Sequence, residues 1–156
     1  MRYTAPSLLL ACALLAPSAT LAAALPANGG DPGKAYRACL DAIAKPDKAG
    51  IIALCFPEGD PWLEKTNLDY FTPETFALEV RQLRPEFRLA DVVISGGKVT
   101  GDKADLQVSG QMTAPRLEPT GEIIEASRDP VKGTVSMIRS SSGWRPSESE
   151  LERTFE

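Results

Sequence analysis

Hydrophobic residues recur at helical spacing in the first half of the chain, after an apolar leader. Between residues 31 and 45 one helical face carries Tyr36, Cys39, Leu40 and Ile43. Asp31 followed by Pro32 is typical of a helix start, because the aspartate can accept a hydrogen bond from a free amide and proline fits the first helical position. Lys45 and Pro46 end the pattern. The spacing therefore predicts a first helix that is capped by Asp31.

Two more helices are predicted before the pattern changes. Asp47 can cap a short helix that runs to Cys55 and stops before Pro57. Thr72 and Pro73 open a third helix by the same logic. Its apolar stripe is Phe76, Val80 and Leu83. Its other face carries Glu79, Arg81, Gln82 and Arg84, which we interpret as a solvated face. Residues 58–71 have no helical period, and we expect them to be irregular.

From residue 87 onward the period changes to two, the period of a strand with one wet face. A strand is predicted over 87–94, with a turn at Gly96 and Gly97. The next strand buries Ala104, Leu106, Val108 and Met112. A proline-bearing connection over 114–119 leads to Ile123 and Ile124, and another strand spans 131–137. A hairpin turn over 140–143 precedes a last short strand at Trp144, and the charged tail over 148–156 is expected to fray.

These elements predict an α+β fold. N-terminal helices pack on one face of a curved, cone-like antiparallel sheet of about four strands. The length suits one domain with one core, which we place over residues 31–147.

Three stretches of the chain resemble the nuclear transport factor 2-like superfamily, also called cystatin-like, and its small secreted bacterial members in particular. The stretches are 92–99 leading into 101–106, then 131–139, then 142–145 with its glycine–tryptophan–basic order. Pro146 departs from the β-branched residues that usually follow, so the last strand is expected to be short and at an edge. The resemblance implies a cone whose sheet wraps around a pocket. That fold hosts isomerases, dehydratases, ligand carriers and assembly modules, so it implies no single activity.

The N-terminus has the three parts of a bacterial export signal. Arg2 precedes an uncharged run over 8–16, and small residues follow over 17–24. The run is about half as long as a membrane span requires. Cleavage after Ala24 or after Ala22 would suit the peptidase. We therefore predict a signal peptide over 1–24, a flexible lead-in over 25–30, a periplasmic location and no transmembrane segment after processing. Lipidation of Cys12 is an alternative, because the leucines before it loosely resemble a lipoprotein processing box.

Charge and composition exclude some of the possible functions. The formal net charge is −4 without a basic stripe, which argues against a nucleic-acid partner. The chain has no histidine, the commonest general base and transition-metal ligand, so we expect no metal site and no cofactor. Cys39 and Cys55 remain once the leader is removed. An even pair of cysteines in an oxidising compartment predicts a disulfide.

Two patterns suggest residues that contact a ligand. Trp62, Tyr70 and Phe71 lie in the long irregular segment, and such segments are often functional, although these aromatics could equally cover the open end of the core. An isomerase-type site on the resembled fold implies an aspartate base that faces a tyrosine or a protonated acid. On this chain the residues that such a site would use are Asp69, Tyr70 and Asp91. The acids Glu122, Glu125 and Asp129 are interpreted as solvated.

The function that these observations favour is a periplasmic, non-enzymatic binding or interaction domain, whose partner is a small ligand or a protein. One alternative is an immunity- or inhibitor-type protein that blocks a basic secreted enzyme with an acidic surface. A second alternative is a small-molecule isomerase or dehydratase on the same fold. A homodimer is left open beside a monomer.

Overall fold

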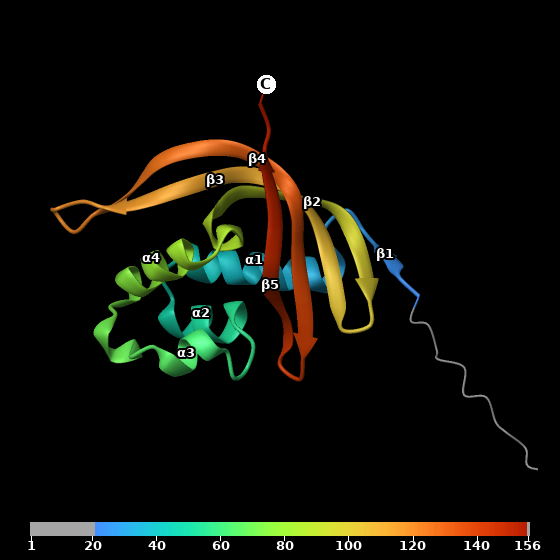
Figure 1. The fold of residues 1–156 in the computed structure, drawn as a ribbon, viewed down its shortest axis with the longest axis horizontal. Coiled ribbons are helices and arrows are strands. Elements are labelled where there is room, and N and C mark those ends of the chain that lie inside the picture. The colour runs from blue at the N-terminus through green and yellow to red at the C-terminus, as the bar shows by residue number, and fades with distance from the viewer. Residues whose placement is uncertain (1–20, 156) are drawn as a thin grey trace, which may run out of the picture.

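The computed structural model describes residues 21–155, which form helices on one side of an antiparallel sheet (Figure 1). The α-helices are α1 (Gly30–Ala44), α2 (Lys48–Cys55), α3 (Pro61–Lys65) and α4 (Pro73–Leu83). The strands are β1 (Ala23–Leu25), β2 (Leu89–Thr100), β3 (Lys103–Leu117), β4 (Ile123–Ser140) and β5 (Gly143–Arg153), in this order across the sheet. The predicted α+β fold class is confirmed, with five described strands in place of about four.

The start of α1 differs from the prediction. Gly29 occupies the N-cap position with a left-handed φ of 77°, and no side chain in the described part of the chain caps the helix. The Asn28 side chain accepts a hydrogen bond from the Gly30 amide at 3.0 Å. The prediction that Asp31 caps this helix is wrong, because the glycine pair lets the chain turn into the helix before the aspartate is reached. Asp31 lies in the first turn, where its charge is favourable to the helix dipole.

α2 follows the prediction, and so does the disulfide. The Asp47 side chain accepts a hydrogen bond from the Gly50 amide at 3.0 Å, and the helix ends at Cys55. Cys39 of α1 and Cys55 are joined by a disulfide, and both are fully buried. The bridge therefore fixes two consecutive helices to each other from inside the helical layer.

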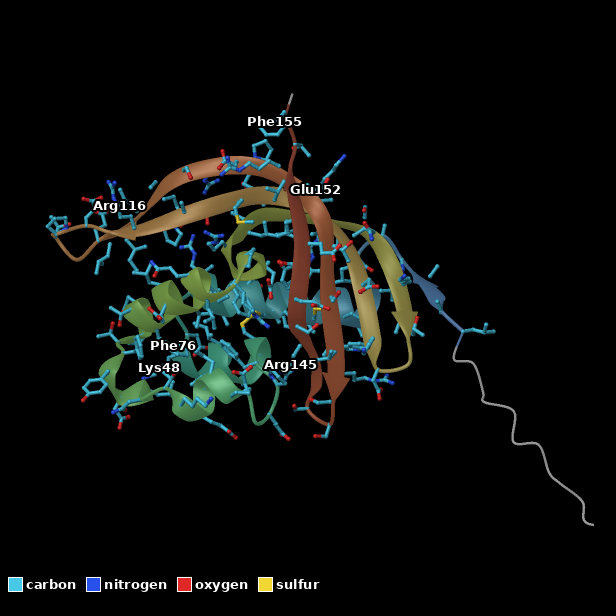
Figure 2. The ribbon with its side chains drawn as sticks, viewed as in Figure 1. Lys48, Phe76, Arg116, Arg145, Glu152 and Phe155 are labelled. Atoms are coloured by element: carbon cyan, nitrogen blue, oxygen red, sulfur yellow. A yellow bond between two sulfur atoms is a disulfide. The ribbon has the colours of Figure 1, made fainter. Side chains whose placement is uncertain are left out.

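The segment between α2 and α4 is more regular than predicted. It forms α3, which the Asp60 side chain caps, and a 3₁₀ helix η1 (Leu68–Tyr70). The Lys48 Nζ donates to the backbone carbonyls of Leu68 and Phe71 and lies 5.9 Å from the Phe76 ring centroid. Figure 2 shows Lys48 and Phe76 together in the helical layer. This lysine holds the segment against the helices on either side of it.

The glycine pair that was predicted as a turn lies inside β2. The turn falls at Gly101 and Asp102, between β2 and β3. Gly96 takes part in a register shift of β2 against β3. A side chain at Gly97 would collide with the backbone carbonyl of Asp105, so glycine is required there for the close approach of β3. The pair marks an irregularity within a long strand and not its end.

β3 and β4 extend past the rest of the described sheet. The predicted connection over 114–119 lies largely in β3, where Pro115 pairs with Glu125. β2 pairs with β3 only as far as Leu89 with Met112, and β4 pairs with β5 only from Val131 onward. Residues 113–117 and 123–128 therefore form a two-stranded extension, which we call the arm; Figure 1 shows it overhanging α4. Pro115 is tolerated because β3 has no described neighbour on its other side there.

β5 is an edge strand and is longer than predicted. The hairpin turn over 140–143 is confirmed, with Ser140 paired to Gly143. Residues 148–153 continue the strand, so the expectation of a fraying tail from Glu148 is wrong for them. Pro146 lies at the sheet edge as expected, where a missing N–H costs no ladder hydrogen bond.

Two apolar clusters hold the layers together. One joins α1 to the inner face of the sheet and contains Tyr36, Leu106 and Trp144. The other fills the helical layer around the disulfide and contains Phe56, Phe76 and Phe87. Both are closed to solvent by the packing of helices on one sheet face.

A buried charged group joins the helical layer to β5. Glu86, in the 3₁₀ helix η2 (Pro85–Arg88), is 1% exposed, and its Oε1 lies 3.0 Å from the Nε of Arg84. Its Oε2 accepts a hydrogen bond from the Ser149 hydroxyl at 2.8 Å. The Tyr36 hydroxyl donates to the Glu86 backbone carbonyl at 2.7 Å. Burial, and after it the charge of Glu86, raises the pKa of Tyr36 well above its ordinary value.

The Arg84 guanidinium has further partners. It donates to the backbone carbonyls of Pro146 and Ser147 and lies 4.3 Å from the Phe87 ring centroid. Its Nε contacts Glu86 without hydrogen-bond alignment, so the pair is a charge contact. Burial lowers the pKa of Arg84, and the charge of Glu86 opposes that change.

The N-terminal predictions fall mostly outside the structure. Residues 1–20, with most of the predicted signal peptide and Cys12, lie outside the described residues. Ala23 and Ala24, at the end of the predicted leader, pair in β1 with Val99 and Lys98. Within the described range, none of the helices has the length and apolar character needed to cross a membrane.

Candidate functional site

A cavity of about 670 Å³ opens between the helical layer and the sheet. Its walls come from α1, α4, η2, β2 and the two strands of the arm. The apolar wall includes Leu40, Ile43, Leu78, Phe87, Leu89 and Ile123. Small-molecule sites usually have volumes of about 300–1,000 Å³ and mostly apolar walls with a few polar groups. The cavity has the size of such a site and combines an apolar wall with a larger set of charged side chains.

The polar part of the wall is rich in arginine. It consists mainly of Arg37, Arg81, Arg88 and Arg128, with Asp41, Asp91 and Glu125. Four arginines against three carboxylates leave an excess of one positive charge, in a chain whose formal net charge is −4. Cations are therefore concentrated at this place against the overall balance of the molecule.

Arg81 links α4 to the arm. Its Nη2 donates to the Thr113 hydroxyl at 2.6 Å and to Glu125 Oε1 at 2.6 Å. The Thr113 hydroxyl, which is buried, donates in turn to the backbone carbonyl of Arg88 at 2.7 Å. The charges of Arg81 and Glu125 compensate each other, and their contact holds the arm over the cavity.

Asp91 lines the cavity at an irregular point of β2. The register of β2 against β3 shifts there, and Asp91 has a left-handed φ of 52°. Such a backbone is uncommon for residues other than glycine and tends to occur at functional sites. The Asp91 carboxylate lies 3.2 Å from Nη1 of Arg128 on β4. Nearby, Arg37 of α1 donates to the backbone carbonyl of Val92 at 3.1 Å.

Arg88 differs from the other three arginines of the cavity. It lies where η2 passes into β2 and is half-buried. Its Nε is buried and has no hydrogen-bond partner among the described residues. Within residues 21–155 no ion pair joins its guanidinium to a carboxylate, whereas Arg81 and Arg128 are each paired with an acid. Arg37 also has no paired acid within the described range, but it donates to a backbone carbonyl, so Arg88 is the cavity arginine with a buried N–H that no described residue accepts.

Four of the five predicted ligand-contacting residues lie elsewhere. Trp62 stacks on Phe56 with ring centroids 5.5 Å apart, and Phe71 packs edge-on against Phe76 in the helical cluster. Asp69 and Tyr70 are exposed, Tyr70 to 85%. Asp91 alone lines the cavity. Ligand contact by the other four stays a prediction.

Sequence reasoning missed most of the cavity residues. Arg81 and Glu125 were each assigned to a solvated face, yet the fold brings them into contact although they are 44 residues apart in the chain. Arg88 belonged to no pattern at all. A faint signal was available, since Arg88 directly precedes a strand and follows a proline-initiated turn.

No group of three or more histidine, cysteine, aspartate or glutamate side chains in the described part of the chain is placed to hold a metal ion. No family model and no curated protein matches the sequence. Among solved structures the chain is similar to a Streptomyces avermitilis protein described as a candidate dehydratase of the NTF2-like family. The identity is 18% and the TM-score 0.44, over 81% of this chain and 95% of that chain. A likeness at this level says nothing about activity.

Proposed function

We propose that this chain is an exported, non-enzymatic binding domain whose small-molecule ligand occupies the cavity between α1, α4, β2 and the arm. The observation that carries the proposal is the cavity itself, with a volume of about 670 Å³, an apolar wall and convergent polar side chains. Those are the usual properties of ligand sites in soluble proteins.

The side chains around the cavity favour binding over acid–base catalysis. A general base needs a proton acceptor that is free to reach the substrate. Asp91 and Glu125 are each engaged by an arginine, Arg128 and Arg81 respectively. The chain has no histidine to take their place. An isomerase or dehydratase that used Asp91 or Glu125 would therefore have to break an ion pair before the carboxylate could act, and the third cavity carboxylate, Asp41, is exposed to water.

Two observations support export. The Cys39–Cys55 disulfide is typical of proteins outside the cytoplasm, and the N-terminal sequence has the composition of a secretory signal. Of the two cleavage positions, the one after Ala22 leaves β1 complete, whereas the one after Ala24 removes two of its three residues. We therefore favour a mature chain that begins at Ala23.

The inhibitor alternative would need a contiguous acidic surface. Glu148, Glu150 and Glu152 do form an exposed row on β5, and Figure 2 shows Glu152 on this strand. Charged side chains on an edge strand also prevent it from pairing with other chains. Because edge protection explains the row without any partner, we rank this alternative below ligand binding.

Two dyes that fluoresce in apolar surroundings test the proposal. Anilinonaphthalenesulfonate and N-phenylnaphthylamine share their rings and differ by one sulfonate. We expect at least one of them to bind the mature protein saturably. Ala44→Trp places a large side chain on the cavity wall at the exposed end of α1 and should weaken binding about tenfold.

Ala53→Trp is the matched control, because Ala53 is also an exposed helical alanine but lies outside the cavity wall. Circular dichroism should show both variants folded. Equal effects of the two substitutions, or no saturable binding of either dye, would refute a ligand site in this cavity. As an independent measurement, native mass spectrometry of protein purified from the periplasm without refolding would identify any ligand that remains bound.

A further inference from the structure

Arg88 is the unexplained residue of the cavity. The other arginines there have protein acceptors: Arg37 donates to a backbone carbonyl, and Arg81 and Arg128 are paired with acids. Arg88 lines the cavity, and its Nε is buried and has no hydrogen-bond partner within residues 21–155. About 90% or more of buried polar groups in native proteins are hydrogen-bonded, so an orphaned guanidinium N–H calls for a specific explanation.

An anionic ligand in the cavity would supply the counter-charge that the Arg88 guanidinium lacks among the described residues. Guanidinium groups present donors in a planar fork that matches carboxylates and related oxyanions, and such charge-assisted hydrogen bonds are stronger than neutral ones. The backbone of Arg88 is held in place, because its carbonyl accepts the hydrogen bond from the buried Thr113 hydroxyl. The guanidinium is therefore presented from a fixed point of the wall.

The charge balance of the wall limits the ligand to a single negative charge. Arg81 and Arg128 are compensated by Glu125 and Asp91. These acids, with Asp41, would repel a second negative charge, and the wall as a whole has an excess of only one cation. A phosphomonoester or a dicarboxylate fits this arrangement poorly, whereas a monoanion fits it well.

The rest of the wall specifies an apolar body. Leu40 and Ile43 of α1 and Ile123 of the arm lie in the same cavity as the guanidinium, together with Phe87 and Leu89 on either side of Arg88 in the chain. Burial of apolar ligand surface against these side chains would stabilise the complex without further polar contacts. An entirely polar anion would leave this wall uncovered.

We infer that the ligand is a small organic monoanion with an apolar body, and that Arg88 binds its carboxylate or equivalent oxyanion group. This inference rests on the proposed function, because it names the class of ligand for the same cavity. It also assigns a specificity-determining role to one residue, which the proposed function does not.

The dye pair tests the inference directly, because the two dyes differ only in the anionic group. We expect the wild-type protein to bind anilinonaphthalenesulfonate at least about tenfold more tightly than N-phenylnaphthylamine, the factor that one charge-assisted hydrogen bond can provide. Arg88→Gln should reduce this preference to about onefold while leaving the affinity for the neutral dye unchanged. Arg88→Lys keeps the charge and should retain part of the preference.

Arg116→Gln is the matched control. Figure 2 shows Arg116 on the arm. This residue is exposed and is not one of the residues that line the cavity. This substitution removes the same charge from the same protein, so it should leave the preference intact. A loss of preference in Arg116→Gln equal to that in Arg88→Gln would mean that overall charge and not Arg88 selects the sulfonate, and would overturn the inference.

The remaining outcomes separate the two proposals. If both dyes bind equally well and Ala44→Trp weakens both, the cavity is a ligand site and the inference about anions fails alone. If Arg88→Gln keeps the full preference for the sulfonate, Arg88 is not the anion-binding residue. If neither dye binds saturably, the proposed function fails and the inference fails with it. Because the Arg88 guanidinium pairs with no acid in the described chain, its replacement should not unfold the protein, and unchanged circular dichroism will confirm this.

Discussion

The buried pair of Arg84 and Glu86 makes a sharp prediction about the two ways of removing a charge. Glu86 is 1% exposed at its side chain and Arg84 is 24% exposed. Arg84→Met would leave the Glu86 carboxylate buried, with the Ser149 hydroxyl as its one side-chain partner among the described residues. Breaking a buried pair from one side costs about 3–5 kcal/mol, because the surviving charge is uncompensated. We expect this variant to fall in that range.

The reverse substitution should cost less. Glu86→Gln keeps the shape of the side chain and a hydrogen bond to Ser149. The remaining cation is partly exposed and still donates to the carbonyls of Pro146 and Ser147, so we expect a loss of about 1–2 kcal/mol. The double variant has lost both charges of this pair. It should therefore be more stable than Arg84→Met alone, so that the second substitution rescues the first.

Urea unfolding of the oxidised protein, followed by tryptophan fluorescence, measures these free energies. The exposed pair of Arg116 and Glu118 is the control, since Arg116→Met should cost less than about 1 kcal/mol. The reasoning is refuted if Arg84→Met is as stable as the wild type. It is also refuted if Glu86→Gln destabilises the Arg84→Met background further, since that would mean that the uncompensated carboxylate is not the source of the cost.

Three further predictions concern the disulfide, a tyrosine and the arm. Replacing Cys39 and Cys55 with alanine should lower the free energy of unfolding by about 3 kcal/mol in urea, since the bridge closes a loop of 16 residues. The pKa of Tyr36 is raised in the folded state, so the unfolded chain loses the hydroxyl proton first as the pH rises. The contribution of Tyr36 to the free energy of unfolding is therefore constant below about pH 10 and falls above it, by up to about 1.4 kcal/mol per pH unit. In unfolding measured from pH 9 to 11, Tyr36→Phe should remove that part of the alkaline loss. Glu125→Gln should speed amide exchange in the arm while changing global stability by about 1 kcal/mol or less, since its partner Arg81 then holds the arm less firmly.

Each of these has a clear contrary result. An unchanged unfolding midpoint in the cysteine variant would show that helix packing alone fixes α1 to α2. An equally steep alkaline loss in Tyr36→Phe would assign that loss to other groups. Arm amides that exchange as slowly in Glu125→Gln as in the wild type would show that the strand pairing, and not the ion pair, keeps the arm in place; tightly protected amides of α1 serve as the internal reference.

Local chemistry explains which predictions were confirmed. Helices were identified because apolar residues recur at a period close to 3.6 and because Asp47 and Thr72 cap the helices that follow them. The sheet was identified because residues such as Leu106 and Val108 alternate with polar neighbours. These signals involve residues that are close together in the chain, so they can be recognised from the sequence alone.

Errors arose where the structural role of a residue depends on a neighbour that is distant in the chain. Gly97 has the composition of a turn, but the approach of β3 makes it an interior residue of a strand. Pro115 and Pro146 read as breaks, yet each lies on a strand with an open side, where a missing N–H is harmless. The sequence does not say which side of a strand will be open, so strand lengths were underestimated.

The sequence by itself determined the fold class, the three main helices and the pairing of Cys39 with Cys55. Each depends on the spacing of apolar residues, on helix-capping residues or on an even number of cysteines, and all of these can be recognised in the sequence. Only the tertiary structure decided the cavity and its charges. Arg81 and Glu125 come from a helix and a strand far apart in the chain, and Arg88 stands out because its buried Nε has no partner among residues 21–155. Whether a charge is solvated, paired or left for a ligand depends on the three-dimensional neighbours, and folding alone brings those neighbours together.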